Sequence, residues 1–563
     1  MSKPIKIGAG LLICGLIAAM MVLSLVPPTD RDGLTHHLYV PKLYLKYGGM
    51  IELPAIEFSY YPMNLDLLYI IPLYFGNDIL PKFIHMMFGL FSAAFVYRYL
   101  SKRISSEMAL VGAAFFLSTP VVFRLSITVY VDLGLMFFSF ASLFYLFEWA
   151  KNRFRWQYLF LAGLSCGLAL GTKYNGLVVF FLLAAAVPML YSRISRIDAD
   201  RTACFPIPLT LQNHFKINIH SMLYGFVFIL VALIFFSPWA IRNMVWQGNP
   251  LYPLYTSAFV SQNAQPDVMN TENQPIGRLL KRKLLYDETL METLTTPIRI
   301  FFQGQDDNPQ YFDGKLNPLL AILPLFTLCN RLKKLYFQKT EEAFLAFFSI
   351  LLVMFAFVAS DMRIRYVAPI IAPLVVLSVM GIQDIQSMLA SRFPAIAKRY
   401  GVWITACICM AFLFPNILYI QDQFKKVDPF PYILGRISRD AYIQRYRPEY
   451  AVVQFINRNL KDKAVVLAMF LGGRGYYFDR EVRFEDGRLH SMAKKAASAG
   501  EMSEELNQTG ITHLLIHQFM FNQWVADSLN ERETSILKAL FQDHLHLMFA
   551  FSGFSLFEIN HHP

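Results

Sequence analysis

The stretch IGAGLLICGLIAAMMVLSLV, residues 7–26, decides the class of fold to which this chain belongs. It carries no charge over a length close to the ~20 apolar residues that a helix needs to cross a bilayer. Lys3 and Lys6 precede it, and Pro27-Pro28 end it. A cleaved signal peptide would have an apolar region of only about 7–15 residues. We therefore interpret residues 7–26 as an uncleaved first membrane span with a cytoplasmic N-terminus.

The composition of the whole chain agrees with a membrane protein. Of its 563 residues, 55% are hydrophobic and only 16% are charged, whereas soluble chains carry about 25% charged residues. This composition excludes an ordinary soluble enzyme, a secreted disulfide scaffold and a disordered regulator. The net charge of +11 is the kind that cytoplasmic loops of membrane proteins accumulate. We therefore expect no nucleic-acid partner.

Ten further apolar runs predict a polytopic α-helical protein with about eleven transmembrane helices. The runs centre on residues 83–100, 107–123, 129–149, 157–171, 176–191, 220–240, 316–330, 342–360, 366–383 and 402–420. With the N-terminus inside, most basic loop residues fall on the inside, as the positive-inside rule requires. The short outside loops hold only Arg124, Lys173, Arg363 and Arg365.

This topology predicts two domains. Residues 1–420 form the transmembrane domain, with large outside loops at about 27–82 and 241–315. Residues 421–563 form a soluble extracytoplasmic domain, and their length suffices for a small fold.

The pattern of the tail is typical of an α/β domain. Apolar runs at 464–470 and 512–516 predict strands, polar segments before each predict helices, and alternation at 545–559 closes the domain. The segment Gly472-Gly-Arg-Gly475 lacks the G-x-G-x-x-G spacing of a phosphate cradle and the helix behind it. We interpret it as a turn.

Ionisable residues collect on the predicted outer side. Charge in or beside hydrocarbon is costly and usually functional. A carboxylate there can take the proton of an acceptor hydroxyl as general base, and arginine or lysine can stabilise a departing phosphate. The chemistry therefore fits glycosyl transfer from a lipid-phosphate sugar, although composition alone does not separate an enzyme from a transporter.

These residues lie in landmarks that together resemble the GT-C superfamily of membrane glycosyltransferases. The resemblance is to the bacterial branch near protein O-mannosyltransferases and the lipid A aminoarabinose transferase. Its landmarks are Asp32-Gly-Leu-Thr-His-His-Leu-Tyr-Val-Pro-Lys42, Tyr60-Tyr-Pro-Met-Asn-Leu-Asp-Leu-Leu-Tyr69, Tyr130-Val-Asp-Leu133, Thr172-Lys-Tyr174, Arg242-Asn with Gly248-Asn-Pro-Leu-Tyr-Pro253, Phe312-Asp-Gly-Lys-Leu-Asn-Pro318 and Arg363-Ile-Arg-Tyr-Val-Ala-Pro369. Their order and sidedness carry the resemblance.

The resemblance implies catalytic roles for two acidic residues, and the same landmarks contain eight candidate substrate-binding residues. Asp32 matches the essential acid of the first outside loop and is the expected catalytic base, with Asp30 as the backup. Asp132 matches a second acidic position of the superfamily. The expected substrate-binding residues are Arg363, Arg365, Lys173, Arg242, His36, His37, Tyr60 and Tyr61.

Structural roles remain open for each of them. Either aspartate could cap a helix, Arg365 could snorkel, and the tyrosines could pack at the membrane interface. His36 and His37 could assist acid–base work or hold Asp32. On an α-helix, however, adjacent side chains cannot both face one site, which favours structural hydrogen bonds for them.

We expect neither a cofactor nor a metal. Oligosaccharyltransferases of the superfamily use a divalent metal, but the nearer relatives generally do not, and no residue array has metal-ligand spacing. Asp306-Asp307, Asp313 and Glu449 fit solvated loops instead. Lys281-Arg282-Lys283 could meet anionic headgroups or an anionic acceptor, or could be a solvated helix face.

The resulting hypothesis is an inverting glycosyltransferase of a bacterial inner membrane, with its C-terminal domain in the periplasm. It would use a polyprenyl (undecaprenyl) monophosphate sugar as donor, with membrane lipid around it, and an extracytoplasmic lipid, glycan or protein as acceptor. Lipopolysaccharide modification is one such reaction. The alternatives are a ligase or oligosaccharide transferase that uses a diphosphate-linked glycan, a lipid-linked sugar transporter or flippase, and a non-catalytic scaffold.

Overall fold

The computed structural model consists of two compact units. It describes residues 3–202, 211–259, 275–331, 338–359, 362–484 and 487–560. The helical unit comprises Met1–Ser24, Tyr60–Leu68 and Pro81–Asp428. The mixed unit comprises Leu25–Ser59, Tyr69–Leu80 and Pro429–Pro563. Most of the first predicted outside loop thus folds together with the C-terminal tail.

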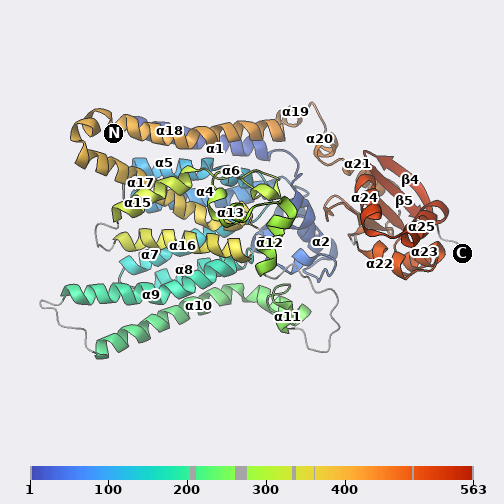
Figure 1. The fold of residues 1–563 in the computed structure, drawn as a ribbon, viewed down its shortest axis with the longest axis horizontal. Coiled ribbons are helices and arrows are strands. Elements are labelled where there is room, and N and C mark those ends of the chain that lie inside the picture. The colour runs from blue at the N-terminus through green and yellow to red at the C-terminus, as the bar shows by residue number, and fades with distance from the viewer. Residues whose placement is uncertain are drawn as a thin grey trace. The chain divides into compact units, whose positions relative to one another are not determined.

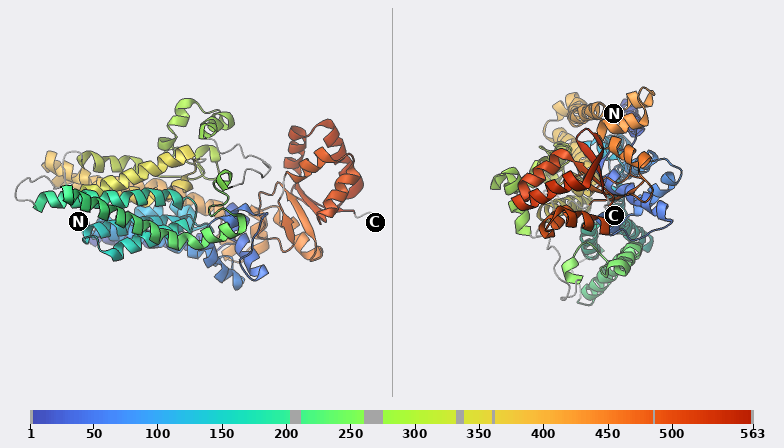
Figure 2. Two further views of the ribbon diagram at one scale, coloured as in Figure 1. Left: turned by 90° about the horizontal axis from the view of Figure 1, so that it is seen from below. Right: turned by 90° about the vertical axis from the view of Figure 1, so that its right-hand side faces the viewer.

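Long apolar helices make up the helical unit (Figure 1, Figure 2). Among the described residues, eight helices are long and apolar enough to cross a membrane, judged by length and composition. They belong to α1 (Lys3–Ser24), α4 (Leu80–Ser101), α7 (Asp132–Lys151), α9 (Gly176–Thr202), α10 (Leu211–Gln247), α16 (Gln338–Ala359), α17 (Ile371–Arg392) and α18 (Pro394–Val427). The prediction of a polytopic α-helical membrane protein is confirmed.

The other three predicted runs also form helices, but of different kinds. Helices α5 (Ser106–Ser118) and α6 (Pro120–Ser126) are bent by 67° and form one broken span or a re-entrant loop. Helices α8 (Trp156–Leu170) and α15 (Leu319–Arg331) have 15 and 13 residues. Both are shorter than the ~20 residues of a perpendicular span.

Glycines allow neighbouring helices of this unit to approach closely. A Cβ on Gly167 of α8 would lie 2.4 Å from the Ala232 carbonyl oxygen of α10. A Cβ on Gly381 of α17 would lie 2.2 Å from the Leu323 carbonyl oxygen of α15. Small residues at such contacts are typical of membrane helices, whose association depends on close packing.

Short elements connect the long helices. The first loop contains the π-helix η1 (Gly33–His37), α2 (Tyr39–Tyr47) and the 3₁₀-helix η2 (Glu57–Tyr60), and α3 (Asn64–Tyr74) follows. The second loop contains α11 (Thr256–Phe259), α12 (Pro275–Tyr286), α13 (Leu290–Leu294), α14 (Thr296–Arg299) and the 3₁₀-helix η4 (Pro309–Tyr311). The 3₁₀-helix η5 (Ile364–Ile370) leads into α17.

The C-terminal tail contains a five-stranded sheet of order β2-β1-β3-β5-β4. Strands β1 (Val465–Met469), β2 (Glu481–Arg483) and β3 (His513–His517) are parallel, and β4 (Leu545–Phe551) and β5 (Phe554–Ile559) form an antiparallel hairpin. The tail helices are α19 (Phe430–Ile433), α20 (Arg439–Tyr446), α21 (Tyr450–Asn459), α22 (Arg488–Lys495), α23 (Ala499–Gln508), α24 (Gln518–Ser528) and α25 (Glu531–Ala539). The predicted α/β character of the tail is confirmed.

The central strands bury both of their faces, because successive side chains point to opposite sides of a sheet. Leu467 and Leu514 pack into one core with residues of α22, α23 and α25. Val466 packs into a second core with α21, and Tyr39 of the first loop belongs to that core. The first loop is thereby part of the hydrophobic core of the mixed unit.

Candidate functional site

Asp32 opens a π-helical turn that brings two histidines beside it. Asp32 occupies the N-cap position of η1, although its side chain makes no capping hydrogen bond. The Leu38 N–H donates to the Gly33 carbonyl oxygen at 2.9 Å, an i→i+5 bond. Ligand atoms of Asp32, His36 and His37 all lie within 4.8 Å of one another. The α-helical geometry assumed from the sequence was therefore wrong here, because the wider π turn lets both rings face Asp32.

Aromatic packing fixes the orientation of the two imidazoles. The His36 ring stacks on Phe58, with centroids 4.4 Å apart, and lies 4.0 Å from the His37 ring. His37 is buried. Both histidines thus lie close to Asp32, and a role in holding or assisting Asp32 stays a prediction.

The turn after strand β1 holds the Asp32 loop. The Tyr476 N–H donates to the Leu34 carbonyl oxygen at 3.1 Å, and the Tyr477 hydroxyl donates to the Pro28 carbonyl oxygen at 2.8 Å. A Cβ on Gly475 would lie 2.3 Å from the Tyr39 ring. Glycine at position 475 therefore lets the turn of the tail approach the first loop.

A buried aspartate ties the region before α4 to the tail. Asp78 pairs with Arg439 and accepts a hydrogen bond from the Tyr476 hydroxyl at 3.2 Å. Burial, assisted by the Asp78 charge, raises the pKa of Tyr476 far above its ordinary value. Tyr476 therefore stays protonated and can donate this hydrogen bond at any physiological pH.

In the helical unit, Asp132 and Lys173 form a close ion pair. The Lys173 Nζ lies 2.7 Å from the Asp132 Oδ1, and the Asp132 side chain is completely buried. Val131, not Asp132, occupies the N-cap position of α7, so the capping alternative for Asp132 does not apply. Arg365 also interacts electrostatically with Asp132.

Aromatic rings surround these cations. The Arg365 guanidinium lies 5.4 Å from the Tyr130 ring centroid and 5.5 Å from that of Tyr366. The Lys173 Nζ lies 5.6 Å from the Tyr366 centroid. Three predicted clusters, widely separated in sequence, thus meet at the ends of the membrane helices.

Arg363 connects this region to the second loop. Its Nη1 lies 3.4 Å from the Asp313 Oδ2. The next residue, Ile364, donates its N–H to the Phe312 carbonyl oxygen at 2.8 Å. Arg363 therefore forms an ion pair with a carboxylate of the second loop.

Arg242 is buried and holds the part of the first outside loop around Tyr61. Its guanidinium donates to the Asn243 Oδ1 at 2.9 and 3.0 Å and to the Tyr61 carbonyl oxygen at 3.2 Å. The same group lies over Trp239 and Trp246, at 4.7 and 5.0 Å. These contacts support the segment around Tyr61; a phosphate contact for Arg242 stays a prediction.

Asn243 is a site residue that was not singled out from the sequence. Its side chain is fully buried and donates to the Tyr60 carbonyl oxygen at 2.8 Å and to the Tyr174 hydroxyl at 3.1 Å. The Tyr61 ring lies 5.1 Å from that of Tyr174. The Arg242-Asn pair was a landmark of the resemblance, and this was the one signal that could have identified Asn243.

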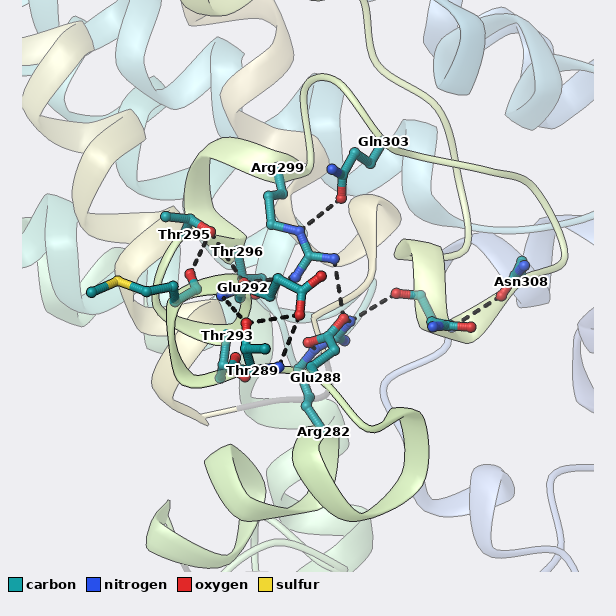
Figure 3. A network of polar contacts seen from close by, with 12 residues as sticks. Arg282, Glu288, Thr289, Glu292, Thr293, Thr295, Thr296, Arg299, Gln303 and Asn308 are labelled. Atoms are coloured by element: carbon teal, nitrogen blue, oxygen red, sulfur yellow. Dashed lines mark hydrogen bonds and ion pairs between the residues drawn. The ribbon is translucent and has the colours of Figure 1, made fainter.

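The second loop has its own polar network (Figure 3). Arg282 donates two hydrogen bonds of 2.8 Å to Glu288, and Arg299 donates a third of 3.2 Å. Burial raises the pKa of Glu288, but the hydrogen bonds from Arg282 and Arg299 outweigh it and lower the pKa overall. Arg282 thus makes its hydrogen bonds within the second loop, whereas Lys283 is exposed.

The interpretation of the loop carboxylates as solvated is wrong for Glu449, whose side chain is 8% exposed and lies 2.6 Å from Arg474, and for Asp306. The Asp306 side chain is 2% exposed and lies 3.0 Å from Arg124. The Tyr419 hydroxyl donates to it at 2.6 Å. Sequence reasoning missed the burial of Asp306 because its two partners, Arg124 of α6 and Tyr419 of α18, are far away in the chain.

Comparisons with known proteins agree with this architecture. Residues 46–246 match the model of the family described as dolichyl-phosphate-mannose-protein mannosyltransferase. The structure of apo ArnT from Cupriavidus metallidurans aligns over 98% of each chain, with 11% identity and a TM-score of 0.55. No curated protein matches the sequence.

Two further solved structures carry lipid phosphates. ArnT from Cupriavidus metallidurans bound to undecaprenyl phosphate aligns over 97% of each chain, with 11% identity and a TM-score of 0.50. The archaeal oligosaccharyltransferase AglB from Archaeoglobus fulgidus, in complex with an inhibitory peptide and a dolichol-phosphate, aligns over 96% of this chain and 74% of AglB, with 12% identity and a TM-score of 0.50. The predicted architecture is confirmed: this chain is a multi-pass membrane protein with the GT-C fold.

Proposed function

We propose that this protein is a glycosyltransferase that takes a sugar from a polyprenyl monophosphate and attaches it to an extracytoplasmic acceptor. The observation that carries the proposal is the group formed by Lys173, Arg365 and Asp132. Two cationic side chains meet there at the ends of membrane helices, the depth at which a membrane lipid presents its phosphate. Cations so placed stabilise the negative charge of a departing phosphate.

The proposed reaction is a single displacement with inversion. Asp32 accepts the proton of the acceptor hydroxyl, whose oxygen forms a bond to the anomeric carbon. The bond between that carbon and the phosphate oxygen breaks, and the phosphate keeps the electron pair. Lys173 and Arg365, with Arg363 beside them, stabilise the phosphate, and no covalent enzyme intermediate forms.

Aromatic and amide groups next to the cations suit the sugar. Tyr61 and Tyr174 lie side by side, and Asn243 supports both of their segments through its hydrogen bonds. Aromatic faces bind the apolar faces of sugar rings, and amides complement hydroxyl groups. We therefore assign the segment around Tyr60 and Tyr61 to the sugar.

We also propose that the protein lies in a bacterial inner membrane, with a cytoplasmic N-terminus and a periplasmic tail. The concentration of basic residues in one set of loops supports this orientation. The acceptor would then be a lipid, a glycan or a protein of the cell envelope.

The likeness to the oligosaccharyltransferase AglB supports a second candidate, an oligosaccharide transferase, and we propose for this candidate a diphosphate-linked glycan as donor. The two candidates differ in the donor, so a donor panel separates them. Purified protein would be incubated with membrane extract and with either monophosphate- or diphosphate-linked sugars, and the released carrier would be quantified. Release of polyprenyl monophosphate from the first set supports the proposal. Turnover of diphosphate donors alone would replace it with the second candidate.

A further inference from the structure

We propose that Asp32, His36 and His37 bind a divalent transition-metal ion such as Zn²⁺. The inference builds on the proposed function, because Asp32 is also the proposed base. It departs from the expectation of no metal, which relied on the nearer relatives and on finding no residue array with metal-ligand spacing in the sequence. The donor set is one carboxylate and two imidazoles, each with a ligand atom within 4.8 Å of the others.

The π turn explains why three residues so close in sequence can share one ion. In a π-helix the hydrogen bond spans five residues rather than four, so positions 36 and 37 both return to the level of position 32. Zn²⁺ bonds of ~2.0–2.1 Å place tetrahedral ligand atoms about 3.3 Å apart. Shifts of roughly 1 Å in the partly exposed Asp32 and His36 side chains would therefore complete the site.

The surroundings keep the three donors in place before any ion binds. Phe58 stacks on His36, and His37 is buried. The Tyr476 N–H holds the Leu34 carbonyl oxygen, and the Thr35 hydroxyl donates to the Arg31 carbonyl oxygen at 2.8 Å. Such π-helical turns occur often at functional sites.

The donor atoms select the class of metal. Imidazole nitrogen suits Zn²⁺ and other late transition ions, whereas Mg²⁺ and Ca²⁺ prefer sites built from oxygen. Three protein ligands leave a fourth position open, as in catalytic zinc sites. A metal ion in such a site lowers the pKa of a bound hydroxyl group. We assign the open position to an oxygen ligand, either water or the acceptor hydroxyl.

Metal binding can be measured directly on the full-length protein in lipid nanodiscs, purified without a polyhistidine tag. After chelation, the protein is titrated with Zn²⁺, and bound zinc is quantified by mass spectrometry. Co²⁺ is titrated in parallel, and its visible absorption reports the ligand geometry. The variants are Asp32→Asn and His37→Ala, with His546→Gln as control, because His546 is an exposed histidine of β4 in the same unit.

We expect the wild type and His546→Gln to bind one Zn²⁺ more per chain than the two site variants. Loss of a supporting ligand contact weakens metal binding by about 10–100-fold, and loss of a direct ligand should weaken it at least as much. Equal zinc binding by wild type and His37→Ala, with both folded by circular dichroism, would overturn the proposal.

The two proposals fail in different ways. Sugar transfer by a wild type that binds no extra zinc would remove the metal site and leave the glycosyltransferase. A bound zinc ion without turnover of any lipid-phosphate sugar would support the metal site and count against the proposed function. His37→Ala keeps the Asp32 carboxylate, so this variant separates the metal from the base.

Discussion

The ammonium of Lys173 lies 2.7 Å from the carboxylate of Asp132, and this contact joins the loop between α8 and α9 to the first turn of α7. Asp132 is completely buried, and the Lys173 side chain is 17% exposed. An ion pair of this kind at the ends of membrane helices neutralises the buried carboxylate and fixes the ammonium. In the proposed reaction, the pair sets where the lipid phosphate meets positive charge.

Replacing Lys173 by methionine should destabilise the protein and abolish donor binding. Removal of one partner of a buried pair costs about 3–5 kcal/mol, because the other charge stays buried and unpaired. The double variant Asp132→Asn/Lys173→Met should recover much of the stability but none of the donor binding. Thermal unfolding and binding of a fluorescent polyprenyl phosphate would measure the two effects separately.

Lys102→Met is the matched control. Lys102 pairs with Glu148 at 3.0 Å; the Lys102 side chain is 42% exposed and that of Glu148 is 11% exposed, against 17% for Lys173 and 0% for Asp132. This variant should therefore cost less stability than Lys173→Met. This variant should keep donor binding. If it lost donor binding as completely as Lys173→Met, the effect could not be assigned to the site.

The substitution Gly475→Val, in the turn after β1 of the tail, should disturb the loop that carries Asp32. A Cβ at this position would lie 2.3 Å from the Tyr39 ring, and overpacking of a core costs typically about 1–3 kcal/mol. We expect a lower melting temperature and a turnover reduced more than that of Gly487→Ala. A Cβ at position 487 has no heavy atom within 4 Å. Equal behaviour of the two variants would contradict the close contact between tail and loop.

Asn243→Leu should impair the segment around Tyr60 and Tyr61. The substitution removes the Asn243 hydrogen bonds of the buried Tyr60 carbonyl oxygen and of the Arg242 guanidinium, at about 0.5–3 kcal/mol for each bond lost. We expect a raised KM for the sugar donor together with reduced stability. Asn459→Ala, at an exposed position of α21, should change neither quantity.

The second loop should loosen at acidic pH. The pKa of Glu288 is lowered in the folded protein, so its ion pairs contribute stability above the ordinary glutamate pKa of ~4.3. This stability is lost as the pH falls through ~4.3 toward the lower folded pKa. Hydrogen exchange across residues 281–303, measured from pH 7 to pH 3 and expressed as protection relative to the intrinsic exchange rate at each pH, should show a loss of protection in that window. In Glu288→Gln, protection of these residues should already be low at pH 7, and its loss in that window should be absent.

The sequence predicted the membrane helices well because hydropathy reports them directly. All eleven apolar runs became helices, although α8 and α15 are shorter than a full span. The sidedness of charged clusters also anticipated the meeting of Asp132 with Lys173 and Arg365. These predictions depend on the hydropathy pattern along the chain and on the cost of placing a charge in hydrocarbon. Both can be judged from a short stretch of sequence.

The sequence could not show contacts made by remote partners. Asp306 looked like a loop residue, but Arg124 and Tyr419 bury it. The place of Tyr39 in the core of the tail likewise depends on residues more than 400 positions away. The π-helical turn at Gly33–His37 could not be predicted for another reason. Turns with α and with π geometry have the same local composition, so no residue pattern distinguished them.

The central claim is that Asp32 is the base of a polyprenyl-phosphate glycosyltransferase. The most direct measurement is the release of free polyprenyl phosphate from monophosphate-linked sugars by wild type, Asp32→Asn and Asp30→Asn, with membrane extract as acceptor. We predict turnover by wild type and Asp30→Asn, and a loss of about 10²–10⁴-fold in Asp32→Asn, with its fold and donor binding intact. Wild-type turnover in Asp32→Asn, or no turnover of any monophosphate donor by the wild type, would contradict the claim.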